Sequence, residues 1–227
     1  MAKESLFRSS IGKKFAMALS ALFLLIFLLQ HFLINALSVI SPKLFNEASH
    51  FMGYNPLIQF LMQPVLIFAV VFHFVMGFVL EIQNKKARGS VNYAVSNKAA
   101  NSTWMSRNMI WSGAVILGFL VLHFIDFWIP EISHKYVCVL PEDPNRYYEE
   151  LLHKFHSPWR VLAYVFAFFL LMMHLLHGFQ SAFQSIGANH RKYTPFIKAF
   201  GKVFAIVIPI GFMLIAIFNY LKVNEII

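Results

Sequence analysis

The sequence predicts an all-α integral membrane protein, a bundle of five transmembrane helices. Hydrophobic residues make up 59% of the 227-residue chain and charged residues only 13%, about half the charged share of a soluble domain. The apolar residues gather in five stretches, and each can cross a bilayer core of about 30 Å, which takes about 20 helical residues. None of them alternates with a period of two, which favours helices over barrel strands. The predicted spans are 15–40, 57–83, 108–129, 160–186 and 199–221.

The first stretch begins like a signal peptide, because "KKFAMALSALFLLIFLL" joins basic residues to an apolar run. No small-residue cleavage site follows it, so we interpret it as a retained helix. We expect a single domain over 1–227, with short interfacial helices in the outer loops 41–56 and 130–159. Pro209 and Gly211 are expected to kink the fifth span, which membrane helices tolerate.

The distribution of Lys and Arg predicts the orientation. Most of these residues lie before the first span and in the loops after the second and fourth spans, which the positive-inside rule assigns to the cytoplasm. With five crossings, the N-terminus is then cytoplasmic and the C-terminus outside. The residues on the basic side are Lys3, Arg8, Lys13, Lys14, Lys85, Lys86, Arg88, Lys98, Arg107, Arg191, Lys192, Lys198 and Lys202.

Charge and cysteine content exclude several functions. The net charge of +9 comes from border residues between apolar runs and not from a basic-aromatic stripe, so no nucleic-acid partner is expected. Cys138 is the single cysteine of the chain. One cysteine provides no intrachain disulfide framework, no cysteine-ligated iron–sulfur cluster and no CxxCH haem attachment.

Five of the ten histidines lie well inside the predicted spans, where an ionisable side chain is costly and usually marks a functional site. At a rise of about 1.5 Å per residue, His31 and His123 lie about 24–25 Å from the basic border. His73, His174 and His177 lie about 15–20 Å from it. A neutral imidazole bonded to a neighbouring helix would explain one such residue, but five of them on four spans indicate matched pairs.

Two pairs of imidazoles at two depths are what two bis-histidine haem groups require. Haem iron takes one axial ligand on each face, and facing helices of a bundle supply both. We expect His31 and His123, the outer pair, to bind one haem. We expect His73 and a histidine of the fourth span, the inner pair, to bind another. An iron with two protein ligands has no open position, so it suits electron transfer.

Depth does not decide between His174 and His177, but a repeated motif favours His174. The second and fourth spans run in the same direction, and both contain His-x-x-x-Gly-Phe, which begins at His73 and at His174. A glycine four residues after a histidine lies on the same helix face and would leave room for the porphyrin. His174 is therefore the expected ligand. His177 is the alternative, and otherwise a neighbour that bonds a propionate or another helix.

These residues resemble a known family. The opening "SSIGKKFAMALSALFL", the four span histidines in order, "HFVMGF" and "HLLHGFQSAFQSIG" are similar to the cytochrome b558 anchor subunit of succinate dehydrogenase/fumarate reductase, the type with five helices and two haems. The resemblance covers essentially the whole chain and rests on the order, spacing and topology of these motifs together.

The resemblance implies two haem b groups, with His73 and His174 binding the one nearer the cytoplasm and His31 and His123 the one nearer the outside. It implies a bacterial cytoplasmic (inner) membrane, and a flavoprotein subunit and an iron–sulfur subunit on the cytoplasmic face. Electrons would pass between these partners and a membrane quinone, menaquinone in bacteria with this subunit type. The chain has no flavin motif, cluster cysteines or dicarboxylate site of its own, so chemistry on succinate would belong to the partners.

A quinone site needs proton donors or acceptors beside a haem edge. Asp126 follows His123 by three residues, close to the outer membrane border. Other titratable residues near that border are Glu47, His50, Glu131 and His134. We regard these residues as candidates for proton exchange, although each could equally be an interfacial residue that faces water or caps a helix.

Two other functions remain as alternatives. The first is the diheme anchor of another quinone-linked enzyme, such as a hydrogenase or formate dehydrogenase, in which the ligands would be arranged differently along the spans. The second is a proton-coupled transporter, which would have inverted repeats and broken helices around a midplane site. A haem protein is red when purified, and a transporter is not.

Overall fold

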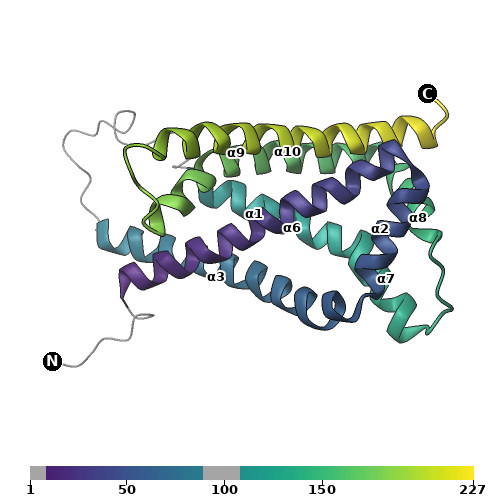
Figure 1. The fold of residues 1–227 in the computed structure, drawn as a ribbon, viewed down its shortest axis with the longest axis horizontal. Coiled ribbons are helices and arrows are strands. Elements are labelled where there is room, and N and C mark those ends of the chain that lie inside the picture. Colours follow the sequence, from purple (N-terminus) through teal and green to yellow (C-terminus); the bar gives the residue numbers. More distant parts are fainter. Residues whose placement is uncertain (1–8, 89–107) are drawn as a thin grey trace.

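A computed structural model describes residues 9–88 and 108–227, and the chain forms an elongated helical bundle (Figure 1). Within these residues, five helices are long and apolar enough to cross a membrane: Ser10–Ile40, Ile58–Ala87, Met109–Val137, Pro158–Ser185 and Thr194–Val223. This confirms the predicted all-α class and number of spans. The structural elements of the spans are α1 (Ser10–Ile40), η1 (Ile58–Met62), α3 (Gln63–Arg88), α6 (Met109–His123), η2 (Phe124–Trp128), α7 (Ile129–Ile132), η3 (Ser133–Val137), α9 (Pro158–Ser185) and α10 (Thr194–Val223).

Local sequence sets several helix ends. Ser9 caps α1, and its side chain accepts a hydrogen bond of 3.0 Å from the amide of Gly12. Prolines occupy the first turns of α9 and α10, where the missing N–H costs nothing. Gly187 follows α9 with a φ of +85°, a left-handed conformation that glycine adopts without strain.

The third span is longer than predicted. It was expected to end near residue 129, but the helix continues through α7 and η3 to Val137. A π-turn, η2, ends at Trp128, two residues before Pro130, and widens the helix close to the point where proline supplies no N–H. Beyond Pro130, Glu131 pairs with Lys135 of the same span and with Arg146 from outside the span, so these charges do not end the helix.

Helices α1, α3, α6 and α9 form a four-helix square that carries the span histidines. Helix α1 packs against α3 and α9, and α6 packs against α9 and α3. This order places α1 opposite α6 and α3 opposite α9. Helix α10 lies outside this square, against α9 and α1 (Figure 1). Each diagonal of the square therefore joins two helices that run in the same direction.

Glycines allow α10 to approach its neighbours closely. A Cβ at Gly201 would lie only 2.5 Å from Phe179 Cδ1, and one at Gly211 would collide with Phe32. Pro209 is fully buried in the same helix, and α10 runs from Thr194 to Val223 with this proline inside it. Near the end of α10, the Asn219 amide donates to Ser38 Oγ of α1 (3.2 Å), a polar contact between two buried side chains.

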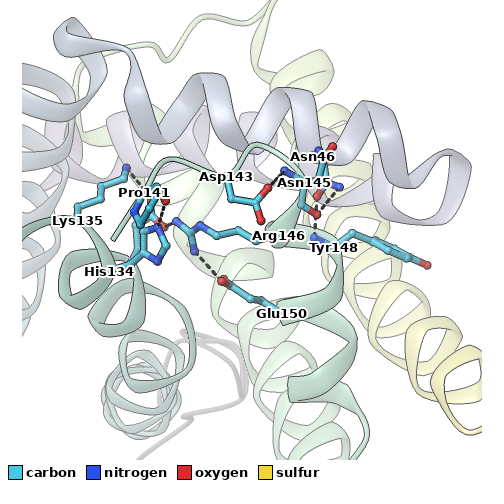
Figure 2. Close-up of polar contacts among 10 residues, drawn as sticks. Asn46, His134, Lys135, Pro141, Asp143, Asn145, Arg146, Tyr148 and Glu150 are labelled. Atoms are coloured by element: carbon cyan, nitrogen blue, oxygen red, sulfur yellow. Dashed lines mark hydrogen bonds and ion pairs between the residues drawn. The ribbon is translucent and has the colours of Figure 1, made fainter. Parts of the chain in front are cut away.

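A cap of two short helices, α2 (Pro42–Tyr54) and α8 (Arg146–Phe155), closes one end of the bundle, as expected for the loops 41–56 and 130–159. The Asn46 side chain joins them, because it donates to the Asn145 carbonyl (2.8 Å) and accepts from the Tyr148 amide (2.7 Å; Figure 2). Arg146 is buried and binds Glu150 (2.7 Å; Figure 2) and Glu131. We call the end that carries these two helices the cap end.

Replacement of Gly201 tests the packing of α10. We expect Gly201→Ala to lower the free energy of unfolding by about 1–3 kcal/mol, because the new methyl group meets the buried Phe179 ring. Thermal unfolding in detergent measures this. The double variant Gly201→Ala/Phe179→Leu should lose less stability than the two single losses added together. Strictly additive losses would contradict the predicted contact.

The cap provides a second test. Arg146→Met should destabilise the protein by about 3 kcal/mol, since it leaves the partly buried Glu131 carboxylate without one of its two cations. Lys43→Met on α2 is the matched control, because the Lys43–Glu47 pair is exposed and 3.9 Å apart and should be worth less than about 1 kcal/mol. Equal effects of the two changes would disprove the structural role of Arg146.

Candidate haem and quinone sites

The inner pair meets across one diagonal of the bundle. His73 of α3 and His174 of α9 have ring centroids 6.4 Å apart and ring planes at 67°. The hydroxyl of Ser20, on α1, lies 3.3 Å from His73 Nδ1, and that of Ser112, on α6, lies 3.2 Å from His174 Nδ1. All four helices of the square thus contribute one side chain to this level.

The outer pair meets across the other diagonal. His31 of α1 and His123 of α6 have ring centroids 5.7 Å apart and planes at 88°. Phe27 stacks on His31, with 5.3 Å between centroids and 18° between planes. Around His123 lie the rings of Phe119, Phe127 and Tyr164. His123 Nδ1 is buried and has no hydrogen-bond partner among the described residues.

The structure brings together the residues that the depth argument grouped. It sets His174 against His73, whereas His177 lies three residues further along α9; both side chains are half-buried. The choice of His174 over His177 as an iron ligand stays a prediction. The motif glycines face the serine-bearing helices, because a Cβ at Gly77 would lie 3.7 Å from Met17 Cε and one at Gly178 would lie 3.4 Å from Met109 Cε.

The spacing of the rings fits a group that bridges two imidazoles. The ring centroids lie 6.4 Å apart in the inner pair and 5.7 Å apart in the outer pair, so each pair could hold one group between its two imidazoles. A bare metal ion would need three or four protein ligands. Residues 9–88 and 108–227 hold no group of three or more His, Cys, Asp or Glu side chains for one. A haem group would bring four porphyrin nitrogens for its iron and would need only two ligands from the protein.

Sequence reasoning missed the two serines, although a signal for them exists. Met17 and Ser20 precede His31 in the pattern Met-x-x-Ser, with Ser20 eleven residues before the histidine. Met109 and Ser112 precede His123 in the same pattern and with the same spacing. This repeat joins the first and third spans in the way that His-x-x-x-Gly-Phe joins the second and fourth.

Asp126, a candidate for proton exchange, is buried at the outer level. It is 2% exposed, and its Oδ2 accepts a hydrogen bond of 2.9 Å from the hydroxyl of Tyr164 and lies 3.3 Å from Arg160 Nε. Its Oδ1 has no hydrogen-bond partner within the part of the chain that the structure describes. Because Tyr164 also contacts the His123 ring, this carboxylate belongs to the surroundings of the outer pair.

The remaining candidates lie at the cap end, mostly in ion pairs. Glu131 lies between Lys135 and Arg146. Glu47 forms an exposed pair with Lys43, and His134 Nε2 contacts the Pro141 carbonyl at 3.1 Å (Figure 2). Through these contacts, Glu131 and His134 mainly hold the cap-end segments together.

His50 has different surroundings. Its Nε2 pairs with Glu142 at 2.7 Å, and its ring stacks on Tyr54 with centroids 4.6 Å apart. The Tyr147 ring is 6.2 Å away. Both His50 Nδ1 and the Tyr147 hydroxyl are buried without a hydrogen-bond partner among the described residues. Unsatisfied polar groups on two neighbouring rings can donate or accept protons at a bound oxygen.

The surroundings of Tyr54 and Tyr147, the two tyrosines beside His50, keep their phenols protonated. Burial raises the pKa of the Tyr147 phenol well above its usual range, and the Glu131 carboxylate raises it further. Burial also raises the pKa of Tyr54. For Arg146, burial acts to lower the pKa, but hydrogen bonds to Glu150 and Glu131 outweigh it and the pKa is raised. The guanidinium is therefore permanently charged and both phenols are hydrogen-bond donors.

Comparison with known proteins assigns the chain to a family. No curated protein and no solved structure gives a significant match to it. The family model of the succinate dehydrogenase/fumarate reductase transmembrane subunit matches residues 83–212, more than half of the chain, including His123, His174 and most of α6, α9 and α10. With its five membrane-spanning helices, the chain is a multi-pass membrane protein that belongs to the succinate dehydrogenase/fumarate reductase transmembrane subunit family.

Proposed function

We propose that this membrane subunit is a diheme cytochrome b, which carries electrons between a soluble iron–sulfur subunit and quinone. The observation that carries the proposal is the pair of imidazole contacts on the two diagonals of one four-helix square. Ser20, at the inner level, and His31, at the outer level, are eleven residues apart on α1, about 16 Å along the helix axis. The two sites are thus separate in depth and alike in ligand type.

The side chains present fit haem b at both levels. His73 and His174 would hold the inner group, and His31 and His123 the outer group. Bound haem supplies an iron that changes between two oxidation states without binding substrate. The protein residues position the rings, and apolar side chains around them exclude water.

The family and the charge distribution support the remaining parts of the proposal. Members of the family are membrane anchors of multi-subunit complexes, which supports a flavoprotein and an iron–sulfur subunit as partners. The basic residues Lys85, Lys86, Arg191 and Lys192 favour a cytoplasmic location for the end opposite the cap. The membrane would be the bacterial cytoplasmic membrane and the quinone menaquinone. Lys98, Arg107 and the first eight residues, which the orientation argument also uses, lie outside the described residues.

The two alternative functions are less well supported. The transporter interpretation needs inverted repeats, whereas both repeated motifs relate helices that run in the same direction. The anchor of a hydrogenase or formate dehydrogenase would also bind two haems, but the family match favours succinate dehydrogenase/fumarate reductase.

Haem content tests the central claim. We expect the protein purified in detergent to contain two haem b groups per chain by the pyridine haemochrome assay. His174→Ala should lose one of them, because His73 then has no partner ring. His177→Ala should retain both. Loss in His177→Ala alone would reverse the choice of ligand, and a folded wild-type protein without haem would overturn the proposed function.

Quinol oxidation tests a further part, a quinone site beside His50 and Tyr147. A menaquinol analogue should reduce the haem of the purified wild-type protein, as followed by its visible spectrum. His50→Ala should slow this reduction at least tenfold and leave full reduction by dithionite, because only the proton-accepting group is lost. Lys43→Gln, at an exposed position of the same helix, is the control and should behave like wild type. An unchanged rate in His50→Ala would place the quinone elsewhere.

A further inference from the structure

Two serines make the same double contact at the inner level. The Ser20 hydroxyl lies 2.8 Å from the Met17 carbonyl oxygen and 3.3 Å from His73 Nδ1. The Ser112 hydroxyl lies 2.9 Å from the Met109 carbonyl oxygen and 3.2 Å from His174 Nδ1. In both cases the serine is on a different helix from the histidine that it contacts.

These contacts determine which ring nitrogen carries the proton. A hydroxyl has one hydrogen, and a backbone carbonyl can only accept, so each serine donates to its carbonyl. The serine oxygen is then left to accept from the imidazole, and Nδ1 must be the protonated nitrogen. A neutral imidazole with its proton on Nδ1 has its free lone pair on Nε2. Both inner rings therefore present Nε2, the nitrogen remote from the serine, for binding a metal.

The repetition makes a packing coincidence a poor explanation. The two serines occupy equivalent positions in the two Met-x-x-Ser motifs, and the two histidines occupy equivalent positions in the two His-x-x-x-Gly-Phe motifs. Helix packing alone requires small residues at such positions, which alanine or glycine would also provide. Both halves of the chain instead have a hydroxyl at the point where it faces Nδ1.

We propose that Ser20 and Ser112 are positioning residues for the two inner histidines and lower the reduction potential of the inner haem. The proposal rests on the proposed function, because it presupposes haem between His73 and His174. A hydrogen bond from the distal nitrogen of a histidine ligand fixes the ring orientation and raises its basicity. A more basic ligand stabilises ferric over ferrous iron, so loss of the acceptor raises the potential.

The outer level provides an internal reference. His123 Nδ1 has no hydrogen-bond partner within residues 9–88 and 108–227. At His31, the Asn35 amide donates to the backbone carbonyl (2.8 Å) and reaches Nε2 only at 3.5 Å. Neither outer ring therefore depends on Ser20 or Ser112, and the outer haem should not respond to changes at these serines.

The test is a redox titration of the purified protein with Ser20→Ala, with Ser112→Ala and with both changes. The potential of the haem that remains in His174→Ala identifies the outer haem, and the other potential belongs to the inner one. We expect both haems to be retained, the inner potential to rise in each single variant and further in the double variant, and the outer potential to stay unchanged. Ser20→Thr and Ser112→Thr keep the hydroxyl and should retain the wild-type potential.

A matched control and the contrary outcomes distinguish a positioning role of Ser20 and Ser112 from a role in helix packing alone. Ser185→Ala removes a similar hydroxyl-to-carbonyl contact, to Ser181 at an exposed end of α9, and should change neither potential. An unchanged inner potential in the double variant, or equal shifts at both haems, would overturn the proposal while the protein remains a diheme cytochrome. Absence of haem from the wild-type protein would instead refute the proposed function itself.

Discussion

The need to satisfy four imidazole rings inside an apolar bundle is the constraint on which the rest of the structure depends. In hydrocarbon, an unpaired polar group is costly, so each ring must face another helix. The square of α1, α3, α6 and α9 places the rings on its diagonals, with His73 facing His174 and His31 facing His123, and serines of α1 and α6 contact the two inner rings. The close approach of α10, through Gly201 and Gly211, packs the outside of the square and keeps its dimensions fixed.

Much of this arrangement could be predicted from the sequence, because it depends on hydrophobic length and helical rise. The spans and the depths of the histidines follow from counting residues, and the rings that were expected to share a level do contact one another. The end of the third span could not be predicted in this way. Pro130 and the charges of Glu131 and Lys135 resemble a loop locally, whereas in the structure a π-turn ends shortly before Pro130 and Glu131 pairs with Arg146 from outside the span.

The serines show a different limit of sequence reasoning. Ser20 and Ser112 are weakly polar residues in apolar helices, a common pattern with no chemical meaning by itself. Their importance comes from a contact between helices, which helical rise and periodicity do not reveal. The constant spacing of eleven residues to His31 and to His123 was visible, but it becomes informative only once the histidines of the other two spans are known to lie beside the serines.

The chain is built from two parallel halves, and this explains how two similar sites can differ in chemistry. Each half contributes one histidine to each level, so neither half forms a site alone. The repeat places a serine beside both inner rings, whereas the outer level has a buried carboxylate, Asp126, with Tyr164 and Arg160 near His123. If both levels hold haem, as proposed, the ligands are alike, and a difference in potential would come from these neighbours. The serines of α1 and α6 and the Asp126–Arg160 pair lie at different levels of the bundle, so the hydrogen bonds of the inner level and the charges of the outer level can be changed independently.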